Sequence, residues 1–455
     1  MARVSTAFFC TECGSETARW QGQCPVCQAW NTLVEEPSAP RGKSPRRESS
    51  TARTSVASAV KLRDVEPQST KRWSTGIDEL DFVLGGGIVP GSLVLLGGEP
   101  GIGKSTLLLQ VAGKMQGSRL DSLYVSGEES AAQIRMRADR LEDPAVDVSF
   151  LAGTDIDAIL RTATESQPVV LVIDSIQTVY TSDLDSAAGS VGQVRECAAR
   201  LQRFAKETGA AVFVVGHVTK DGVVAGPRTL EHIVDTVLYF EGAATLDHRL
   251  VRATKNRFGS VDEIGVFRMS AAGLTAIANP SELFLGQRSR TSGNAVAALI
   301  EGSRPLLVEV QALCTRSNYG APQRVANGFD RQRLALLLAV LERRAGIPFG
   351  ELDVFLNVVG GIRAAEPAAD CAVAAALLSS VRDRAVGAED VFIGEVGLSG
   401  ELRSVSQIER RLTEAGRMGF QRAFIAGRWS PRGEFNGLVA VPTADLRALI
   451  SHLDA

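Results

Sequence analysis

The segment "LVLLGGEPGIGKST", residues 93–106, decides the fold of the central part of the chain. An apolar run with strand character leads into a glycine-rich loop, and a helical pattern begins at Lys104. This order of strand, loop and helix is the context that a phosphate loop requires. Backbone N–H groups of such a loop converge at a helix N-terminus and can hold the phosphates of ATP. The residues expected to bind the nucleotide are Gly98, Glu99, Pro100, Gly101, Ile102, Gly103, Lys104, Ser105 and Thr106.

Two side chains of this loop and one carboxylate outside it are predicted to act on the phosphates. Lys104 is expected to reach the β- and γ-phosphates, and the Ser105 hydroxyl is expected to bind Mg²⁺. The segment "VVLVIDS", residues 169–175, ends an apolar run with Asp174. A carboxylate at this position typically holds Mg²⁺ through water, as the partner of the loop hydroxyl. The pattern therefore predicts a Mg²⁺-dependent ATP site.

A general base is expected from the segment "YVSGEES", residues 124–130, which places Glu128 and Glu129 directly after another predicted strand. One of these glutamates would polarise the attacking water, and the sequence leaves open which one. Both could instead be acids that favour a helix N-terminus. His217 ends a further apolar run and is a candidate sensor of the γ-phosphate, although a polar strand-end histidine is an equally good interpretation.

Between residues 73 and 278 apolar runs alternate with helical patterns. Strands are predicted at 92–98, 121–127, 146–153, 169–175, 210–217 and 235–242, and helices at 104–116, 131–141, 155–166 and 192–209. Continuous apolar strands separated by amphipathic helices predict an α/β domain with a mainly parallel sheet covered on both faces. A second alternation of strands and helices, from about 290 to 455, predicts a separate α+β domain.

Four of the seven cysteines fall in the first 27 residues as two pairs with C-x-x-C spacing. Two such turns brought together offer four thiolates in a closed tetrahedral arrangement, which is typical of structural Zn²⁺. Redox-active or incidental cysteines are the alternative. The predicted zinc ligands are Cys10, Cys13, Cys24 and Cys27. A closed site performs no catalysis, so this knuckle would fold the N-terminus and present a surface to a protein or a DNA strand.

Bulk properties narrow the class of protein. A chain of 455 residues is too long for one core, and a net charge of −3 gives no overall basic excess for nucleic acid. The N-terminus lacks the pattern of a secretory signal, and the longest apolar run, 334–341, is too short to span a bilayer. We therefore expect a cytoplasmic protein without membrane contact. Residues 35–70 are rich in Pro, Ser, Thr, Ala and Arg and predict a flexible, solubilising linker rather than a nucleic-acid contact.

These motifs, together with "KNRFG" at residues 255–259, resemble the bacterial RadA (Sms) family of DNA repair proteins. The resemblance covers nearly the whole chain, and "KNRFG" is its most specific part. It implies a four-cysteine zinc finger over 1–34, a flexible linker over 35–70, a RecA-like ATPase domain over 71–280 and a Lon-protease-like domain over 290–455.

The resemblance also implies roles for cations outside the phosphate loop. RecA-type ATPases form rings or filaments with nucleotide between subunits, so Lys255 and Arg257 would neutralise charge on a neighbour's γ-phosphate, as an arginine finger does. A solvated basic turn is the alternative. Loops at 180–193 and 217–232 would face bound DNA, and their candidate contacts are Lys220 and Arg228.

The function implied is a DNA-stimulated ATPase that moves along single-stranded or branched DNA in homologous recombination and promotes branch migration. A homo-hexameric ring and recombinase or other replication and recombination proteins are the expected partners. A Lon-type protease and a clock-type signalling ATPase are the alternatives. Ala368 stands where the Lon serine is expected and Glu409 about where its lysine is expected, which disfavours proteolysis. A basic surface or an ordinary charged helix face is predicted for Arg403, Arg410, Arg411 and Arg417.

Overall fold

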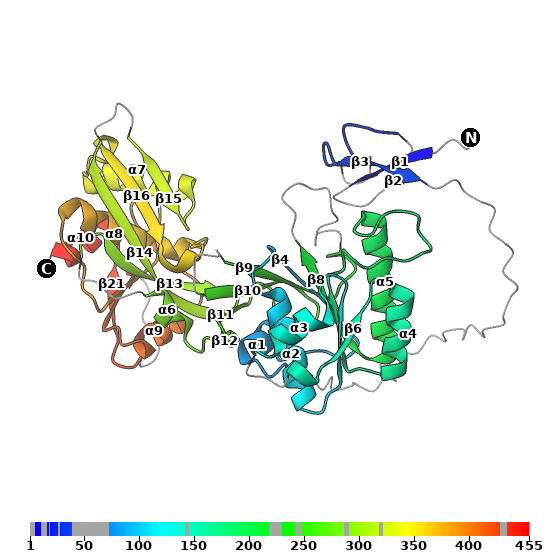
Figure 1. Cartoon of the computed structure of the whole chain (residues 1–455). Helices are drawn as coiled ribbons and strands as arrows, with labels where there is room; N and C mark the ends of the chain where they lie inside the picture. The colour runs from blue at the N-terminus through cyan, green and yellow to red at the C-terminus, as the bar shows by residue number, and fades with distance from the viewer. Residues whose placement is uncertain are drawn as a thin grey trace, which may run out of the picture. The chain divides into compact units, whose positions relative to one another are not determined.

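Strand β4 (Leu93–Gly98) runs through the middle of a large sheet in the computed structural model of the chain (Figure 1). The other strands of this sheet are β5 (Ser122–Ser126), β6 (Ser149–Ala152), β7 (Val170–Asp174), β8 (Ala211–His217), β9 (Thr236–Glu241), β10 (His248–Asn256), β11 (Ile264–Ser270) and β12 (Gly273–Ala276). Their order is β12-β11-β10-β9-β4-β8-β7-β5-β6. The six strands from β9 to β6 in this order are parallel, and β10, β11 and β12 extend the sheet antiparallel. The predicted mainly parallel sheet is confirmed.

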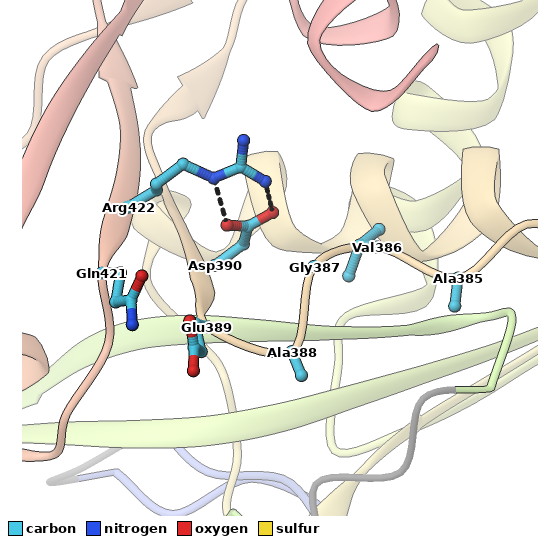
Figure 2. Close-up of a pocket in the computed structure, with 8 residues that line it drawn as sticks. All are labelled: Ala385, Val386, Gly387, Ala388, Glu389, Asp390, Gln421 and Arg422. Carbon is cyan, nitrogen blue, oxygen red and sulfur yellow. Dashed lines mark hydrogen bonds and ion pairs between the residues drawn. The ribbon is translucent and has the colours of Figure 1, made fainter. Parts of the chain in front are cut away.

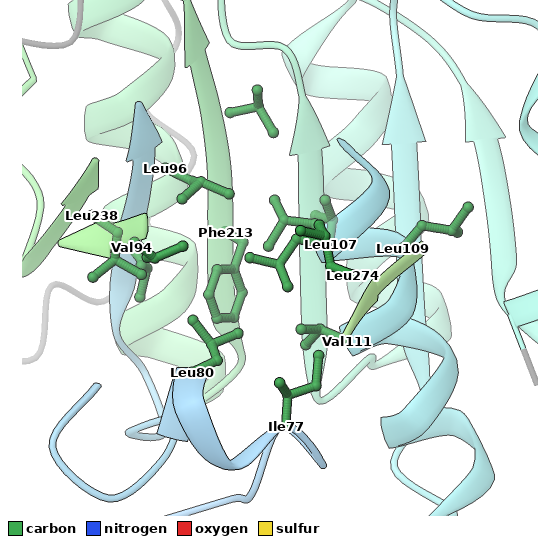
Figure 3. Close-up of a cluster of buried hydrophobic side chains, with 14 of the residues drawn as sticks. Ile77, Leu80, Val94, Leu96, Leu107, Leu109, Val111, Phe213, Leu238 and Leu274 are labelled. Atoms are coloured by element: carbon green, nitrogen blue, oxygen red, sulfur yellow. The ribbon is translucent and has the colours of Figure 1, made fainter. Parts of the chain in front are cut away.

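Helices cover both faces of this sheet, because successive side chains of each buried strand point to opposite faces. Val94 and Leu96 join the apolar cluster of Figure 3 together with Leu107, whereas Leu93 and Leu95 belong to a second cluster. The first cluster includes residues of α1 (Asp78–Leu84), α2 (Lys104–Gly117) and α3 (Ala131–Ala138). The second includes residues of α4 (Ile156–Ser166) and α5 (Val191–Thr208).

The structure describes residues 5–10, 16–17, 19–25, 28–38, 72–141, 145–217, 230–242, 248–285, 291–317, 322–427 and 435–454. The chain divides into two compact units, Met1–Ala276 and Ile277–Ala455. No helix among these described residues combines the length and apolar character needed to cross a membrane.

The N-terminal knuckle is a small antiparallel sheet of β1 (Ser5–Cys10), β2 (Glu16–Thr17) and β3 (Leu33–Ser38). β1 lies in the middle, and Cys10 pairs with Leu33 across the strands. Cys10, Cys24 and Leu33 are buried in one cluster, against which Phe8 packs. Because this cluster is small among the described residues, the knuckle would gain from another source of stability, such as a metal.

The second unit is built on a seven-stranded mixed sheet. Its strands are β13 (Asn294–Glu301), β14 (Arg304–Arg316), β15 (Arg324–Asn327), β16 (Leu352–Val358), β17 (Asp390–Ile393), β20 (Arg422–Ala426) and β21 (Val439–Thr443), in the order β15-β16-β14-β13-β17-β20-β21. Its helices are α6 (Pro280–Phe284), α7 (Arg331–Ala345), α8 (Asp370–Arg382), α9 (Ile408–Arg417) and α10 (Leu446–Asp454), and a short hairpin pairs β18 (Glu395–Val396) with β19 (Leu402–Arg403). Helix α8 packs on β13 and β14, and α9 contributes Leu412 to a core shared with Leu307.

Candidate functional site

Four neighbouring parallel strands deliver the predicted ATP-site residues to one edge of the large sheet. β4, β8, β7 and β5 lie side by side, and their register pairs Gly98 with His217 and Ser126 with Asp174. Glu128 follows two residues after β5. Ligands of open α/β sheets bind at this carboxyl edge, where the helix N-termini also lie.

The phosphate loop has three residues with positive φ, a conformation that glycine adopts readily. Gly98, Gly101 and Gly103 have φ values of 151°, 73° and 118°. A Cβ at Gly103 would lie 2.6 Å from Met269, whereas one at Gly101 would meet open space, where the loop leaves room for phosphate. This geometry fits the predicted nucleotide cradle.

Lys104 is buried and folds back on its own loop. Its Nζ donates to the carbonyl oxygens of Gly98 at 2.9 Å and Glu99 at 2.8 Å. Burial lowers the pKa of Lys104 to about 8, although the negative charges of Asp174 and Glu128 oppose the shift. An anionic phosphate in the loop would supply a negative charge that stabilises the ammonium form of Lys104.

Asp174 is held by a tyrosine that sequence reasoning missed. The hydroxyl of Tyr124 donates to Oδ2 of Asp174 at 2.5 Å, and both side chains are buried. Burial, and then the charge of Asp174, raise the pKa of Tyr124 well above its ordinary value. Tyr124 therefore stays a neutral donor and fixes one carboxylate oxygen. Tyr124 lies on β5, beside β7, so its proximity to Asp174 follows from strand pairing.

The two candidate general bases occupy different surroundings. Oε1 of Glu128 accepts a hydrogen bond from the Ser175 hydroxyl at 2.5 Å and lies 3.5 Å from Nε2 of His217. Oε1 of Glu129 instead pairs with Arg137 at 2.5 Å. The Glu128 side chain is 44% exposed and lies close enough to Lys104 to influence its pKa. Glu128 thus faces the phosphate loop, and Glu129 is tied to helix α3.

His217 connects strand β8 to this group. Its Nε2 faces Glu128, and its Nδ1 is buried without a hydrogen-bond partner among the described residues. The residue directly precedes a segment that the structure does not describe, which contains the predicted DNA contacts Lys220 and Arg228. Those two residues therefore lie outside the described residues.

The other loop predicted to face DNA is tightly folded. The side-chain amide of Gln193, which is buried, donates to the carbonyls of Thr181, Leu184 and Ser186. Arg200 pairs with Asp183 at 2.5 Å. Residues 181–186 thus wrap around one amide, and contact between this loop and DNA stays a prediction.

The KNRFG segment (residues 255–259) lies at the opposite edge of the sheet from the phosphate loop. Lys255 pairs with Val237 near the start of β9, which runs parallel to β4. Nζ of Lys255 donates to the backbone carbonyls of Glu231 and Val234, in the turn before β9. Burial lowers the pKa of this lysine. Arg257 is 49% exposed and pairs with the buried carboxylate of Asp235 at 3.1 Å. Arg257 is therefore the more available of the two cations.

Two of the four predicted zinc ligands can be placed. Cys10 and Cys24 are buried in the knuckle core, and Sγ of Cys10 lies 3.2 Å from the Thr32 hydroxyl. Cys13 and Cys27 lie outside the described residues. Two cysteines gathered in one small cluster of the described residues fit a structural Zn²⁺ site, because thiolates are the ligands that this ion prefers.

The second unit offers a separate pocket, shown in Figure 2. It is lined by the loop 385–389 and by Gln421, and Arg422 forms two 2.7 Å hydrogen bonds with buried Asp390 in its wall. The pocket contains none of the predicted site residues. The paired charges in its wall satisfy each other, so it gives no indication of chemistry.

The prediction that Arg411 belongs to a basic surface or a charged helix face is wrong. Its side chain is fully buried and donates to both carboxylate oxygens of Glu366, at 2.7 and 2.6 Å, and to the Ala298 carbonyl. Of the other three arginines in that prediction, Arg403 and Arg417 pair with neighbouring glutamates. The carboxylates offset much of the charge that a basic surface would need.

The segment predicted to resemble a Lon-type protease has buried structural contacts at the described positions where catalytic residues were expected. Ala368 is buried and precedes α8, whose first residue, Asp370, is fully buried. Burial raises the pKa of Asp370, and the ion pair with Arg333 and a hydrogen bond from Val396 oppose the shift. Glu409 lies on α9. Neither Ala368 nor Glu409 can perform the chemistry of a serine–lysine pair.

The sheet order, the phosphate loop and the residues at its carboxyl edge together define a RecA-like phosphate-loop ATPase core. Residues 58–223 match the AAA domain family, and residues 8–35 match the rubredoxin metal binding domain family.

The whole-chain relatives specify the family. The chain is 49% identical to the DNA repair protein RadA of Pseudomonas aeruginosa over 456 residues, which is 100% of both chains. It is 49% identical to that of Halalkalibacterium halodurans over 93% of both chains, and 46% identical to that of Escherichia coli over 98% of both. This chain belongs to the RadA family of DNA repair proteins.

Proposed function

We propose that this protein is a Mg²⁺-dependent, DNA-stimulated ATPase that moves along single-stranded or branched DNA in homologous recombination and repair and extends heteroduplex by branch migration. ATP hydrolysis follows from the ATPase core. The link to DNA is supported by the relatives, each of which is named a DNA repair protein. Recombinase or other recombination proteins are its proposed partners, and the cytoplasm its proposed location.

Within one chain, each group has a distinct task. The loop N–H groups and Lys104 would hold the β- and γ-phosphates. Ser105 and Asp174 would hold Mg²⁺, which neutralises charge on the phosphates when bound. Glu128 would accept the proton of the attacking water, and the adjacent Ser175 and His217 would orient its carboxylate. His217 would report the loss of the γ-phosphate to the segment that follows it.

The observation that carries the proposal is the placement of the phosphate loop and the KNRFG segment at opposite edges of one sheet. Strand β4 joins Leu93, next to Asp235 and Arg257, to Gly98 of the loop. Five residues of extended strand separate Leu93 from Gly98 by about 17 Å. Arg257 therefore cannot reach the phosphates of its own chain, but it could complete the site of an adjoining copy in a closed homo-hexameric ring.

Two appendages complete the proposed motor. Cys10, Cys13, Cys24 and Cys27 would bind a structural Zn²⁺ and present the knuckle to a partner. Lys220 and Arg228 would touch the phosphate backbone. The second unit, with a Lon-like fold but with Ala368 at the position of the catalytic serine, would serve assembly or DNA contact. A protease or a clock-type signalling ATPase is not favoured.

ATP hydrolysis with and without single-stranded DNA, at two salt concentrations, tests this function. We expect stimulation by DNA that weakens as salt rises, because cation–phosphate contacts release counterions. Turnover that is the same with and without DNA at both salt concentrations would contradict the proposal. Digestion of casein that needs ATP and is lost in Lys104→Ala would revive the protease alternative.

A further inference from the structure

The KNRFG segment is built against the C-terminal end of helix α1. Nδ2 of Asn256 donates to the carbonyl of Leu84, the last residue of α1, at 3.2 Å, and Oδ1 accepts from the backbone N of Phe258 at 3.0 Å. A Cβ added to Gly85 would lie only 3.1 Å from Cα of Gly259. The backbones of the two segments are therefore in close contact.

One side chain from outside both segments joins them. Nη1 of Arg72 donates to the carbonyl of Leu84 at 3.1 Å, and Nη2 donates to the carbonyl of Phe258 at 2.5 Å. Arg72 and Phe258 are separated by 186 residues in sequence. Because a guanidinium is planar and presents its donors in a fixed arrangement, it holds the two carbonyls at a set separation.

Three consecutive glycines let Arg72 approach. Gly85, Gly86 and Gly87 have φ values of 82°, 108° and 114°, which residues other than glycine rarely adopt. A Cβ at Gly87 would lie 2.6 Å from the carbonyl oxygen of Trp73. This turn of glycines gives the segment that begins at Arg72 room to pass beside the helix end.

We propose that Arg72 is a positioning residue for the cation that completes the neighbour's ATP site. The inference rests on the proposed action of Arg257 on an adjoining copy. Arg72 holds the carbonyl of Phe258, the residue next to Arg257, and so fixes the backbone from which Arg257 projects. Arg72 lies beside α1 and the KNRFG segment, at the edge of the sheet away from its own phosphate loop. Its loss should therefore impair the site of the next subunit and leave its own nucleotide binding intact.

Steady-state kinetics of the full-length protein give the first test. Arg72→Ala should lower kcat about 10- to 100-fold, the cost of misplacing a reacting group by about 1 Å. Binding of a fluorescent ATP analogue should change less than about twofold, because the phosphate loop is untouched. Arg72→Lys, which keeps a cation but not the planar pair of donors, should give an intermediate loss and serves if the alanine variant does not fold. Arg161→Ala, which removes an exposed arginine of α4, is the control and should keep full turnover.

Mixing subunits distinguishes positioning of a trans-acting cation from a general structural role. Lys104→Ala subunits have inactive phosphate loops but intact KNRFG segments. Arg72→Ala subunits have intact phosphate loops but misplaced KNRFG segments. In a mixture, roughly a quarter of interfaces pair an intact loop with an intact segment. ATP turnover should therefore rise well above that of either variant alone.

The same mixture made with Arg257→Ala separates the two hypotheses. Rescue of both Arg72→Ala and Arg257→Ala by Lys104→Ala subunits supports the role of Arg72. Rescue of Arg257→Ala alone would overturn that role and leave the proposed function standing. Rescue of neither variant would overturn the proposed trans-acting site itself.

Discussion

The carboxylate of Asp235 lies 3.1 Å from Nη1 of Arg257 and also accepts the backbone N–H of Leu93, at 3.1 Å. Asp235 thereby connects the KNRFG segment to the first residue of the strand that ends in the phosphate loop. A strand in the middle of a sheet is rigid. If Arg257 completes a neighbour's site as proposed, its displacement by that neighbour's nucleotide would act on β4 through Asp235.

Glu128→Gln is expected to lower kcat for ATP hydrolysis by about 10²- to 10⁴-fold, the usual contribution of a general base. ATP binding should survive, because the phosphate loop is unchanged. Glu129→Gln should cost less than about tenfold, since Oε1 of Glu129 is already paired with Arg137. Single-turnover hydrolysis measures both variants. A greater loss in Glu129→Gln than in Glu128→Gln would reverse the assignment.

Tyr124→Phe removes the hydrogen bond to Asp174 and keeps the ring that fills the core. We expect the Mg²⁺ concentration at half-maximal turnover to rise about 10- to 100-fold, in line with the loss of one hydrogen bond to a charged group. Turnover at saturating Mg²⁺ should be nearly restored. A variant with unchanged Mg²⁺ dependence would show that Tyr124 does not orient the carboxylate.

Nucleotide binding should take up a proton above about pH 8. The pKa of Lys104 is lowered to about 8 in the free protein, so much of this lysine is neutral at higher pH. Bound phosphate favours the ammonium and raises that pKa, so binding draws in a proton and weakens as pH rises. Calorimetry near pH 9 in buffers with different ionisation enthalpies measures this uptake.

A conservative variant controls for other groups that titrate in this range. Lys104→Arg stays charged throughout, so the uptake should disappear. Equal proton uptake in the wild type and in Lys104→Arg would assign the linkage to another group.

Arg411→Ala should destabilise the second unit by about 3 kcal/mol, because it leaves the carboxylate of Glu366 and the Ala298 carbonyl without their buried donor. Arg410→Ala, an exposed neighbour on α9, should stay within about 0.5 kcal/mol of the wild type. Urea unfolding of the full chain compares them. A similar small effect for both would show that the buried pair contributes little.

The central architecture could be predicted because its signals are local. Continuous apolar runs bounded by glycine or aspartate indicate six strands. The phosphate loop shows that the first of these strands ends at Gly98 and that a helix follows. The antiparallel extension by β10, β11 and β12 was not anticipated. β10 contains His248, Arg249, Arg252 and Lys255, and its cations conceal the apolar alternation that marks a strand.

The residues that support the site were missed because they act across long separations. Arg72 belongs to no motif, and Tyr124 begins the segment YVSGEES without a role of its own there; both side chains meet their partners only after the sheet has formed. Arg411 had a usable signal. It follows Ile408 by three residues and precedes Ala415 by four, which places it on the apolar face of its helix.

The most direct test of the central claim is the ATP turnover of a 1:1 mixture of Lys104→Ala and Arg257→Ala subunits. Each variant alone should be almost inactive, the first because it cannot hold the phosphates and the second because it cannot complete a neighbour's site. The mixture should regain a substantial fraction of wild-type turnover. A mixture no more active than its components, under conditions where labelled subunits are seen to exchange, would contradict the account.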